Sequence, residues 1–362
     1  MTVTEQQVQD ALKNLIDPNT RKDFVSTKSA RGIKVDGDKV ALEILLGYPA
    51  KSQVAPIRED VTKALKAIPG VTGVSVDVQM KIVSHAVQRG VKLVPGIKNI
   101  IAVASGKGGV GKSTVAVNLA LALAAEGASV GVLDADIYGP SQPTMLGIRG
   151  RPESRDGKSL EPMEGHGMQA MSIGFLIDTE TPMVWRGPMV TQALEQLLNE
   201  TKWREVDYLV VDLPPGTGDI QLTLAQRVPV TGAVIVTTPQ DIALMDARKG
   251  LKMFEKVGVP ILGIVENMST HVCSKCGHEE HIFGEGGGER MGKDYNVELL
   301  GALPLDIHIR EQADSGKPTV VSDPDGRVSQ VYKQIARRVA VKIAERAQDH
   351  SAAFPKIVVQ NT

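Results

Sequence analysis

The sequence predicts an α/β protein in which a doubly wound, mostly parallel sheet is preceded by a small α+β domain. Three observations lead to this fold class. The chain has 362 residues, which is too long for one ordinary domain. From about residue 98 onward, short apolar runs alternate with helix-like segments, as parallel strands joined by crossover helices do. Before residue 83, the apolar spacing gives a different order of elements: helix, strand, strand, helix, strand.

The small domain is expected to span residues 1–82. Thr4 with Gln7 fits a capping box, so a helix is expected to begin there. The elements that follow are strands at 33–35 and 40–46 around a tight Asp-Gly turn, a helix at 57–68 and a strand at 74–78. Residues 83–97 contain Gly and Pro steps and are expected to form a linker.

The large domain is expected at residues 98–350 and is followed by a C-terminal tail at 351–362. Its strands are expected at runs of apolar residues suited to burial on both faces of a sheet, namely 99–104, 129–133, 208–212, 232–237 and 261–265. Helices are expected at 115–124 and near 327–348. The Gly/Glu/Pro-rich stretch 149–168 is expected to be a surface insertion or a hairpin.

A glycine-rich segment with two lysines lies between the first strand and the first helix of the large domain. It matches the phosphate-binding pattern G-x-x-x-x-G-K-[ST], in which backbone N–H groups surround a polyphosphate. Lys112 is suited to bind the β/γ-phosphates and Ser113 to ligate Mg²⁺. The residues expected to contact the nucleotide here are Gly106, Lys107, Gly108, Gly109, Val110, Gly111, Lys112, Ser113 and Thr114.

Two acidic strand ends are expected beside this loop. Asp212 ends an apolar run and fits a Walker-B carboxylate that reaches Mg²⁺ directly or through water. The Pro-Pro-Gly-Thr-Gly segment that follows is expected to be a switch loop near the γ-phosphate. Asp134 and Asp136 end another strand, and two residues apart on an extended chain they share one side. One of the two can orient water while the other supports the metal shell.

The chain has two cysteines, Cys273 and Cys276, which form a C-x-x-C motif. Two thiolates at this spacing can bind one metal or cluster, but a tetrahedral site needs four ligands. Spacing alone leaves four interpretations open. Two chains could share a [4Fe–4S] cluster, or one chain could bind zinc with His271, His278 or His281. The pair could also be a redox dithiol, which the absence of a following helix disfavours, or two reduced thiols.

Five ordered motifs of the large domain resemble the Mrp/ApbC family of iron–sulfur cluster carrier proteins, P-loop ATPases of the MinD-like deviant-Walker group. They are the loop at 106–114, Asp-Ala-Asp-Ile-Tyr-Gly-Pro-Ser at 134–141, Asp-Leu-Pro-Pro-Gly-Thr-Gly-Asp at 212–219, Thr-Pro-Gln-Asp at 238–241 and Glu-Asn-Met-Ser at 266–269. Residues 1–82 resemble, with fewer matching features, the small domain that is fused to or works beside iron–sulfur assembly factors. That segment contains no cysteine, so no cluster ligand is expected in it.

The resemblance implies a homodimer that binds ATP at two facing sites. Lys107 would match the signature lysine that crosses to the partner's nucleotide. Lys107, Lys112 and Asp136 are then the expected catalytic residues, with Asp136 positioning the hydrolytic water. Basal turnover is expected to be slow, because the sequence shows no evident arginine finger and water is the nucleophile.

The resemblance also implies the binding residues. Ser113 and Asp212 are expected to hold Mg²⁺, and Asn267 is expected to read the adenine base. Cys273 and Cys276 of both chains are expected to bridge a labile [4Fe–4S] cluster, which the protein transfers to apo-proteins. The expected cofactors are therefore ATP, Mg²⁺ and the cluster, and the expected partners are apo iron–sulfur proteins and cluster assembly factors.

Two other functions use the same loop: a MinD/ParA-like positioning ATPase, and a zinc-stabilised ATP-dependent metal-insertion chaperone. A net charge of −1 gives no electrostatic case for binding nucleic acid or an anionic membrane. No apolar run approaches the roughly 18 residues that span a bilayer. The first residues lack a signal-peptide pattern, and the low cysteine content suits a reducing compartment. We expect a cytoplasmic protein without a nucleic-acid or membrane partner.

Overall fold

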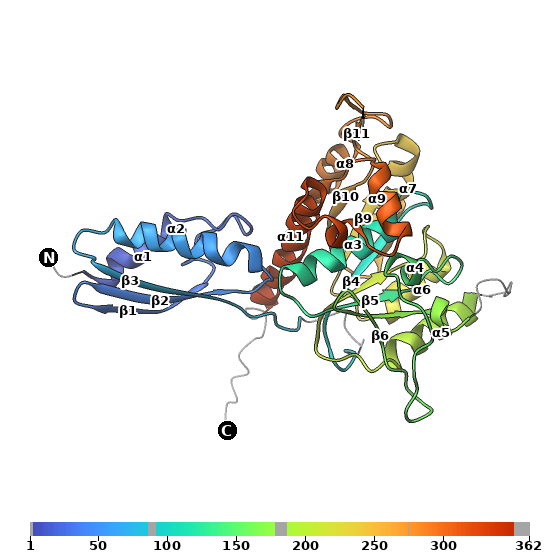
Figure 1. Cartoon of the computed structure of the whole chain (residues 1–362), viewed down its shortest axis with the longest axis horizontal. Helices are drawn as coiled ribbons and strands as arrows, with labels where there is room; N and C mark the ends of the chain where they lie inside the picture. Colours follow the sequence, from blue (N-terminus) through green and yellow to red (C-terminus); the bar gives the residue numbers. More distant parts are fainter. Residues whose placement is uncertain (1–2, 86–91, 178–186, 274, 351–362) are drawn as a thin grey trace, which may run out of the picture.

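The computed structural model describes residues 3–85, 92–177, 187–273 and 275–350. The tail expected at 351–362 lies outside these residues, and so do residues 86–91 of the expected linker. Two domains with separate sheets are visible, and a long C-terminal helix lies at their junction (Figure 1). The expected fold class is confirmed.

The small domain has the expected order of elements. It contains α1 (Glu5–Lys13), β1 (Ala30–Asp36), β2 (Lys39–Leu46), the short 3-10 helix η1 (Lys51–Gln53), α2 (Val54–Lys66) and β3 (Gly73–Met80). The capping box at Thr4 is formed, because the Thr4 hydroxyl accepts from the Gln7 N–H and the Gln7 side chain accepts from the Thr4 N–H. β2 pairs antiparallel with β1 and parallel with β3.

The large domain is built on an eight-stranded sheet. Its strands are β4 (Ile97–Ser105), β5 (Val130–Asp134), β6 (Met163–Gly165), β7 (Met168–Ser172), β8 (Val206–Asp212), β9 (Gly232–Thr237), β10 (Ile261–Glu266) and β13 (Leu299–Ala302). Their order is β13-β10-β9-β4-β8-β5-β7-β6, and every neighbouring pair is parallel except β6–β7. The Gly-rich stretch therefore does more than form a surface insertion, because the hairpin at its end extends the sheet beside β5.

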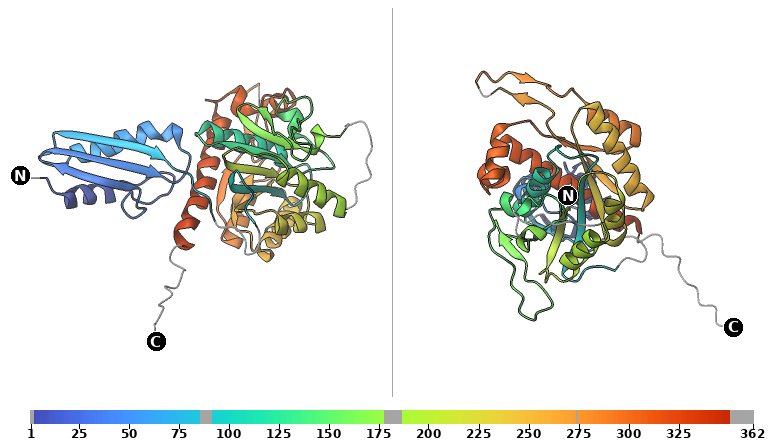
Figure 2. Two further views of the ribbon diagram at one scale, coloured as in Figure 1. Left: turned by 90° about the horizontal axis from the view of Figure 1, so that it is seen from below. Right: turned by 90° about the vertical axis from the view of Figure 1, so that its right-hand side faces the viewer.

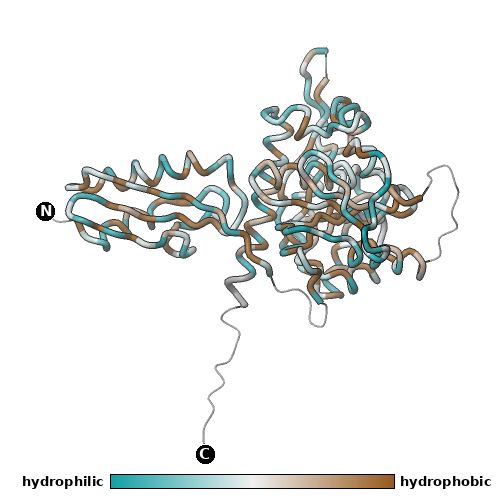
Figure 3. Tube along the Cα trace, turned by 60° about the horizontal axis from the view of Figure 1, so that its bottom comes forward, coloured by the Kyte–Doolittle hydropathy of each residue, from teal (hydrophilic) through white to brown (hydrophobic). Residues whose placement is uncertain are grey.

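Helices cover both faces of this sheet (Figures 1 and 2). They are α3 (Lys112–Ala125), α4 (Gln142–Met145), α5 (Gly187–Asn199), α6 (Asp219–Arg227), α7 (Asp241–Lys256), α8 (Gly287–Tyr295), α9 (Ile307–Asp314), α10 (Thr319–Ser322) and α11 (Arg327–His350), with the 3-10 helix η2 (Ile173–Phe175). α3 packs against the sheet and against α10 and α11, so it is buried almost all round and is apolar on every side. Figure 3 shows the apolar stretches gathered inside this domain.

The helix α3 is also joined to the α10 segment by a buried side chain. Asn118 of α3 accepts from the backbone N–H of Val320 at 3.0 Å, and its amide donates to the Thr114 carbonyl at 3.0 Å. The two helices therefore form one packed block behind the glycine-rich loop.

A two-stranded hairpin projects from the large domain, at the top of Figure 1. It consists of β11 (His271–Val272) and β12 (Glu279–Glu280), which pair antiparallel. The hairpin is attached through the segment before α9, because the Leu305 N–H donates to the Thr270 carbonyl at 2.7 Å. Among the helices of the described residues, none is long and apolar enough to cross a lipid bilayer.

The two domains meet at the C-terminal end of α3. The buried carboxylate of Glu126 pairs with Arg337 of α11 and accepts from the Ser52 hydroxyl at 2.8 Å. Arg337 also donates to Asn19 of the small domain at 3.0 Å. On the chain between the domains, His85 is buried and its Nδ1 lies 2.7 Å from the side-chain oxygen of Asn99 in β4.

Candidate functional site

The glycine-rich loop lies where the strand order of the large sheet reverses. β4 has β9 on one side and β8 on the other, and the loop joins β4 to α3. Ligands of open α/β sheets bind at such a switch point. Gly109 and Gly111 have φ angles of 81° and 78°, in the left-handed region that favours glycine. The backbone therefore turns sharply into the N-terminus of α3, where its N–H groups and the helix dipole favour an anion.

Two glycines of the loop also allow close packing. A Cβ on Gly106 would lie 2.1 Å from the backbone carbon of Asp246 in α7. A Cβ on Gly111 would lie 2.3 Å from the Nδ2 atom of Asn267. Asn267 is buried, and its Nδ2 donates to the Val110 carbonyl at 2.9 Å. The loop is therefore held by α7 on one side and by the segment after β10 on the other.

Lys112 is buried and its ammonium lies among oxygen atoms. It forms a close ion pair with Oδ1 of Asp212, and its Nζ is 3.2 Å from the Ser113 hydroxyl. Oδ2 of Asp136 lies 3.9 Å away. The three residues expected from the sequence at the phosphate end of the site, Lys112, Asp136 and Asp212, are therefore together.

Sheet register explains why the carboxylates meet. Asp212 at the end of β8 pairs with Val103 of β4 on one side and with Asp134 of β5 on the other. Three parallel strands thus end at the same edge, next to the loop. A side chain that the sequence analysis did not single out joins them, because Gln142 Nε2 donates to Asp212 Oδ2 at 2.9 Å and to the Ser113 carbonyl at 3.1 Å.

Asp134 holds the backbone of this edge. It is buried and accepts from the Ser172 hydroxyl at 3.0 Å and from the backbone N–H groups of Gln142 and Asp136 at 3.1 and 3.2 Å. Burial, followed by repulsion from Asp212, raises the pKa of Asp134 to about 7. The pKa of Asp136 is raised mainly by burial, against the attraction of Lys112.

Lys107 and the segment after β8 flank the loop. Lys107 is half-buried, and its side chain has no hydrogen bond or ion pair in the part of the chain that the structure describes. The Gly216 N–H of the Pro-Pro-Gly-Thr-Gly segment donates to the Ser105 carbonyl at 2.9 Å. Gln221 donates to the Pro215 carbonyl at 2.5 Å. The segment expected to be a switch loop is therefore tied to the strand that precedes the phosphate loop.

The oxygen donors beside Lys112 fit a magnesium ion. The Ser113 hydroxyl and the Asp212 carboxylate already share one cation, the Lys112 ammonium. Hydroxyl and carboxylate oxygens are ligands that Mg²⁺ takes next to substrate phosphates. The residues present therefore fit Mg²⁺, and their role as its ligands stays a prediction.

The two thiols lie at the tip of the β11–β12 hairpin. Both are free, Cys273 partly exposed and Cys276 exposed. The backbone N–H groups of Lys275 and Cys276, with the Cys276 side chain, lower the pKa of Cys273 by hydrogen bonding to its sulfur. Ser274 lies outside the described residues.

Of the three histidines considered as ligands, His271 and His281 have ring nitrogens close to backbone carbonyls, and His278 is exposed. His271 Nδ1 lies 3.2 Å from the Leu305 carbonyl, and His281 Nδ1 lies 2.8 Å from the Ser269 carbonyl. Over the described ranges, no three His, Cys, Asp or Glu side chains are grouped to hold a metal ion. The zinc site considered from the sequence is therefore not assembled by the described side chains of one chain.

Comparison with known families decides the assignment. Residues 96–340 match the ParA family model, described as NUBPL iron-transfer P-loop NTPase. The chain belongs to this family of iron-transfer P-loop NTPases. Residues 5–78 match a second model, described as iron–sulfur cluster assembly protein. The resemblance expected from the five motifs is confirmed.

Individual relatives of this iron-transfer NTPase cover most of its length. The iron–sulfur cluster carrier protein of Haemophilus influenzae is 51% identical over 340 residues, which are 94% of this chain and 92% of that protein. The protein of that name from Pseudomonas fragi is 59% identical over 275 residues, 75% of this chain and 96% of the relative. A nucleotide-binding protein from Archaeoglobus fulgidus, solved in complex with ADP, has a TM-score of 0.56 at 38% identity and covers 64% of this chain and 90% of its own.

Gln142 is the residue of this iron-transfer NTPase that sequence reasoning missed. It is buried, and its Oε1 atom has no hydrogen-bond partner among the described residues. No motif required a glutamine there. The one available signal was its place shortly after the Asp134 strand end, in a segment that must turn back toward the phosphate loop.

Proposed function

We propose that the protein binds and hydrolyses ATP and carries a [4Fe–4S] cluster, held at a homodimer interface, to apo-proteins. The observation that carries this proposal is the pair of free thiols at the hairpin tip. Cys273 and Cys276 can supply two of four ligands, and the described side chains of the same chain supply no others. A second copy offers the missing pair. Free thiols also suit a reducing compartment such as the cytoplasm.

The glycine-rich loop supports ATP as the nucleotide. Phosphates at the N-terminus of α3 would draw the Lys112 ammonium away from Asp212, since both compete for the same charge. Asn267 uses its Nδ2 atom on the loop, so its Oδ1 atom is the one that would accept from the adenine amino group. The relative of known structure binds ADP, and its similarity extends over this domain.

The side chains around Lys112 have distinct roles in hydrolysis. Bound Mg²⁺, held by Ser113 and Asp212, would neutralise phosphate charge. Asp136 would accept a hydrogen bond from the attacking water, and the burial of its carboxylate would strengthen that bond. Asp134 and Gln142 position these groups through the contacts at 2.9–3.2 Å.

The surface around the loop supports dimerisation through the nucleotide face. Ile242 and Met245 of α7 are 70% and 57% exposed, and α7 packs directly against Gly106. Tyr138, in the segment after Asp136, is 61% exposed. Large apolar side chains beside a binding loop mark a contact surface. A second copy placed there would bring each Lys107 to the opposite nucleotide.

The proposal is tested by counting iron and sulfide. After anaerobic reconstitution, we expect four iron and four sulfide ions per dimer of wild-type protein, as a [4Fe–4S] cluster requires. The double variant Cys273→Ala, Cys276→Ala should lose both ions and keep ATP binding, because the thiols lie on a separate hairpin. Iron and sulfide contents of the variant equal to those of wild type would overturn the proposal. One zinc ion per chain without sulfide in the wild-type protein would overturn it as well.

A further inference from the structure

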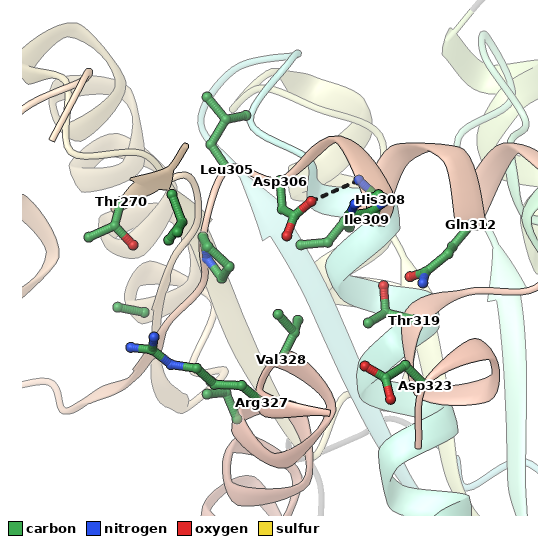
Figure 4. Close-up of a pocket in the computed structure, with 14 residues that line it drawn as sticks. Thr270, Leu305, Asp306, His308, Ile309, Gln312, Thr319, Asp323, Arg327 and Val328 are labelled. Atoms are coloured by element: carbon green, nitrogen blue, oxygen red, sulfur yellow. Dashed lines mark hydrogen bonds between the residues drawn. The ribbon is translucent and has the colours of Figure 1, made fainter. Parts of the chain in front are cut away.

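A cavity of about 430 Å³ lies at the base of the thiol hairpin. Thr270 and Val272, at the start of the hairpin, form one wall, and the other walls come from residues 302–306, α9, α10 and the start of α11. Figure 4 shows Thr270 and Arg327 on one side of the cavity and Gln312, Thr319 and Asp323 on the other. Val272 is the residue directly before Cys273, so whatever occupies this cavity lies next to the thiols.

Two polar groups of the cavity are buried without a partner. The Thr319 side chain is buried, and its hydroxyl has no hydrogen bond among the described residues. The same holds for the Oε1 atom of Gln312. An unsatisfied buried polar group costs about 1–3 kcal/mol, so native proteins usually supply it with water or a ligand. Both groups can accept hydrogen bonds.

The lining of the cavity carries an excess of negative charge. Asp306 and Asp323 both line it, and neither forms an ion pair with a described residue. The guanidinium of Arg327, which also lines the cavity, pairs at 3.3 Å with Glu279, a residue that does not line it. A ligand that carries positive charge and donates hydrogen bonds therefore fits best.

Aliphatic side chains complete the lining. They include Val272, Leu305, Ile309, Val328 and Val331. A ligand must therefore combine an apolar body with a cationic head. Arginine and lysine have this form, with an aliphatic stem and a head that donates up to five or three hydrogen bonds.

We propose that this cavity binds an arginine or lysine side chain, together with an adjoining aliphatic residue, of the protein that receives the cluster. A protein segment is favoured over a free small cation because the aliphatic wall and the carboxylates lie side by side, as neighbouring residues of a peptide require. Its placement next to Cys273 would bring the recipient to the cluster. The identity of this partner as a recipient rests on the proposed function; the binding chemistry does not.

The test uses the full-length protein without nucleotide or metal and two acetylated, amidated peptides in calorimetric titrations. One peptide is Gly-Leu-Arg-Leu-Gly, and the other carries citrulline, the neutral isostere, in place of arginine. We expect the arginine peptide to bind at least about tenfold more tightly than the citrulline peptide, since it alone makes charge-assisted hydrogen bonds.

Variants locate the binding site. Asp306 accepts from the His308 N–H at the start of α9, and asparagine preserves such a cap. The double variant Asp306→Asn, Asp323→Asn should therefore fold and should bind the arginine peptide at least about tenfold more weakly. Thr319→Val should also bind the peptide more weakly, because it removes the buried hydroxyl while the shape of the side chain stays nearly the same. The matched control is Asp325→Asn, an exposed charge in the same loop that does not line the cavity.

Three outcomes would overturn the proposal. They are equal binding of both peptides, wild-type binding by the double variant, and tight binding of spermidine where the arginine peptide does not bind, which would mark a polyamine site. The double variant should keep the iron and sulfide content of wild type. Failure of the peptide test thus remains distinct from failure of cluster binding, which the cysteine variants report.

Discussion

Asp134 and Asp212 are buried side by side at adjacent strand ends, and one cation serves the pair. Asp212 has Lys112, whereas Asp134 has hydrogen bonds from Ser172 and two backbone N–H groups. Burial and the Asp212 charge together raise the pKa of Asp134 to about 7. The hydrogen bonds order the strand end, and the missing cation makes Asp134 the side chain whose charge is least well stabilised.

This arrangement predicts a pH dependence of stability. The pKa of Asp134 is about 7 in the fold and near the ordinary 3.8 in the unfolded chain, so between these values the fold binds more protons. The free energy of unfolding should therefore fall as pH rises from about 4 to about 7. The asparagine of the variant Asp134→Asn does not ionise, so the free energy of unfolding of that variant lacks this pH dependence. The melting temperatures of both proteins should be measured at pH 5 and pH 8. Relative to wild type, the variant should be more stable at pH 8 than at pH 5; an equal difference in melting temperature at both pH values would contradict this.

At the scale of elements, α3 connects the phosphate loop with the small domain. A carboxylate at a helix C-terminus, such as Glu126, is unfavourable to the helix dipole. Here Arg337 and Ser52 compensate for it, one from α11 and one from the small domain. The helix can therefore end in a buried acid because two other elements meet it there.

Glu126→Gln should destabilise the protein by about 3–5 kcal/mol, because it leaves the Arg337 guanidinium buried without a counter-charge. The matched control is Glu345→Gln, which removes the partially exposed pair with Lys22 and should cost less than about 1 kcal/mol. Denaturant unfolding measures both. Similar losses in the two variants would show that the Glu126 pair contributes no more than a surface pair.

The sequence predicted the central strands well and the sheet edge poorly. β9 occupies the expected 232–237, because a strand buried on both faces must be an unbroken apolar run. α3 begins at Lys112 and not at 115, since its polar first turn belongs to the phosphate loop. β6 and β7 form a hairpin at the end of the stretch 149–168, one of the two forms expected there, but the pairing of β7 with β5 was not expected, because local sequence does not encode it.

The candidate site shows the same difference between residues that local sequence identifies and contacts that form only on folding. Lys112, Asp136 and Asp212 could be named from motifs, since each motif fixes its own residue types at a strand or helix end. Gln142 could not, because its contacts with Asp212 and Ser113 arise only when three segments fold together. The cavity at the base of the thiol hairpin is likewise formed by segments that local sequence does not relate.

At the scale of the whole molecule, Lys107, whose side chain has no partner among the described residues, predicts behaviour that depends on a second copy. Lys107→Ala should keep ATP binding, because Lys112 still contacts the phosphates, and should lower turnover about 100-fold or more by removing a charge at the transition state. The matched control is Lys98→Ala, on β4 before the loop, where the lysine pairs with Asp207. ATP binding, turnover and mass by light scattering test this. Unchanged turnover would exclude a catalytic role in the partner's site.

Cys273 is partly exposed and Cys276 exposed at a hairpin tip, and this position has a practical consequence. Accessible thiols oxidise stepwise in air, first to sulfenic acid or disulfide and then to sulfinic and sulfonic acids that ordinary reductants do not reverse. A preparation handled in air would lose cargo capacity while its nucleotide loop stayed intact. Titrating both thiols before adding iron would separate damaged protein from protein that does not bind a cluster.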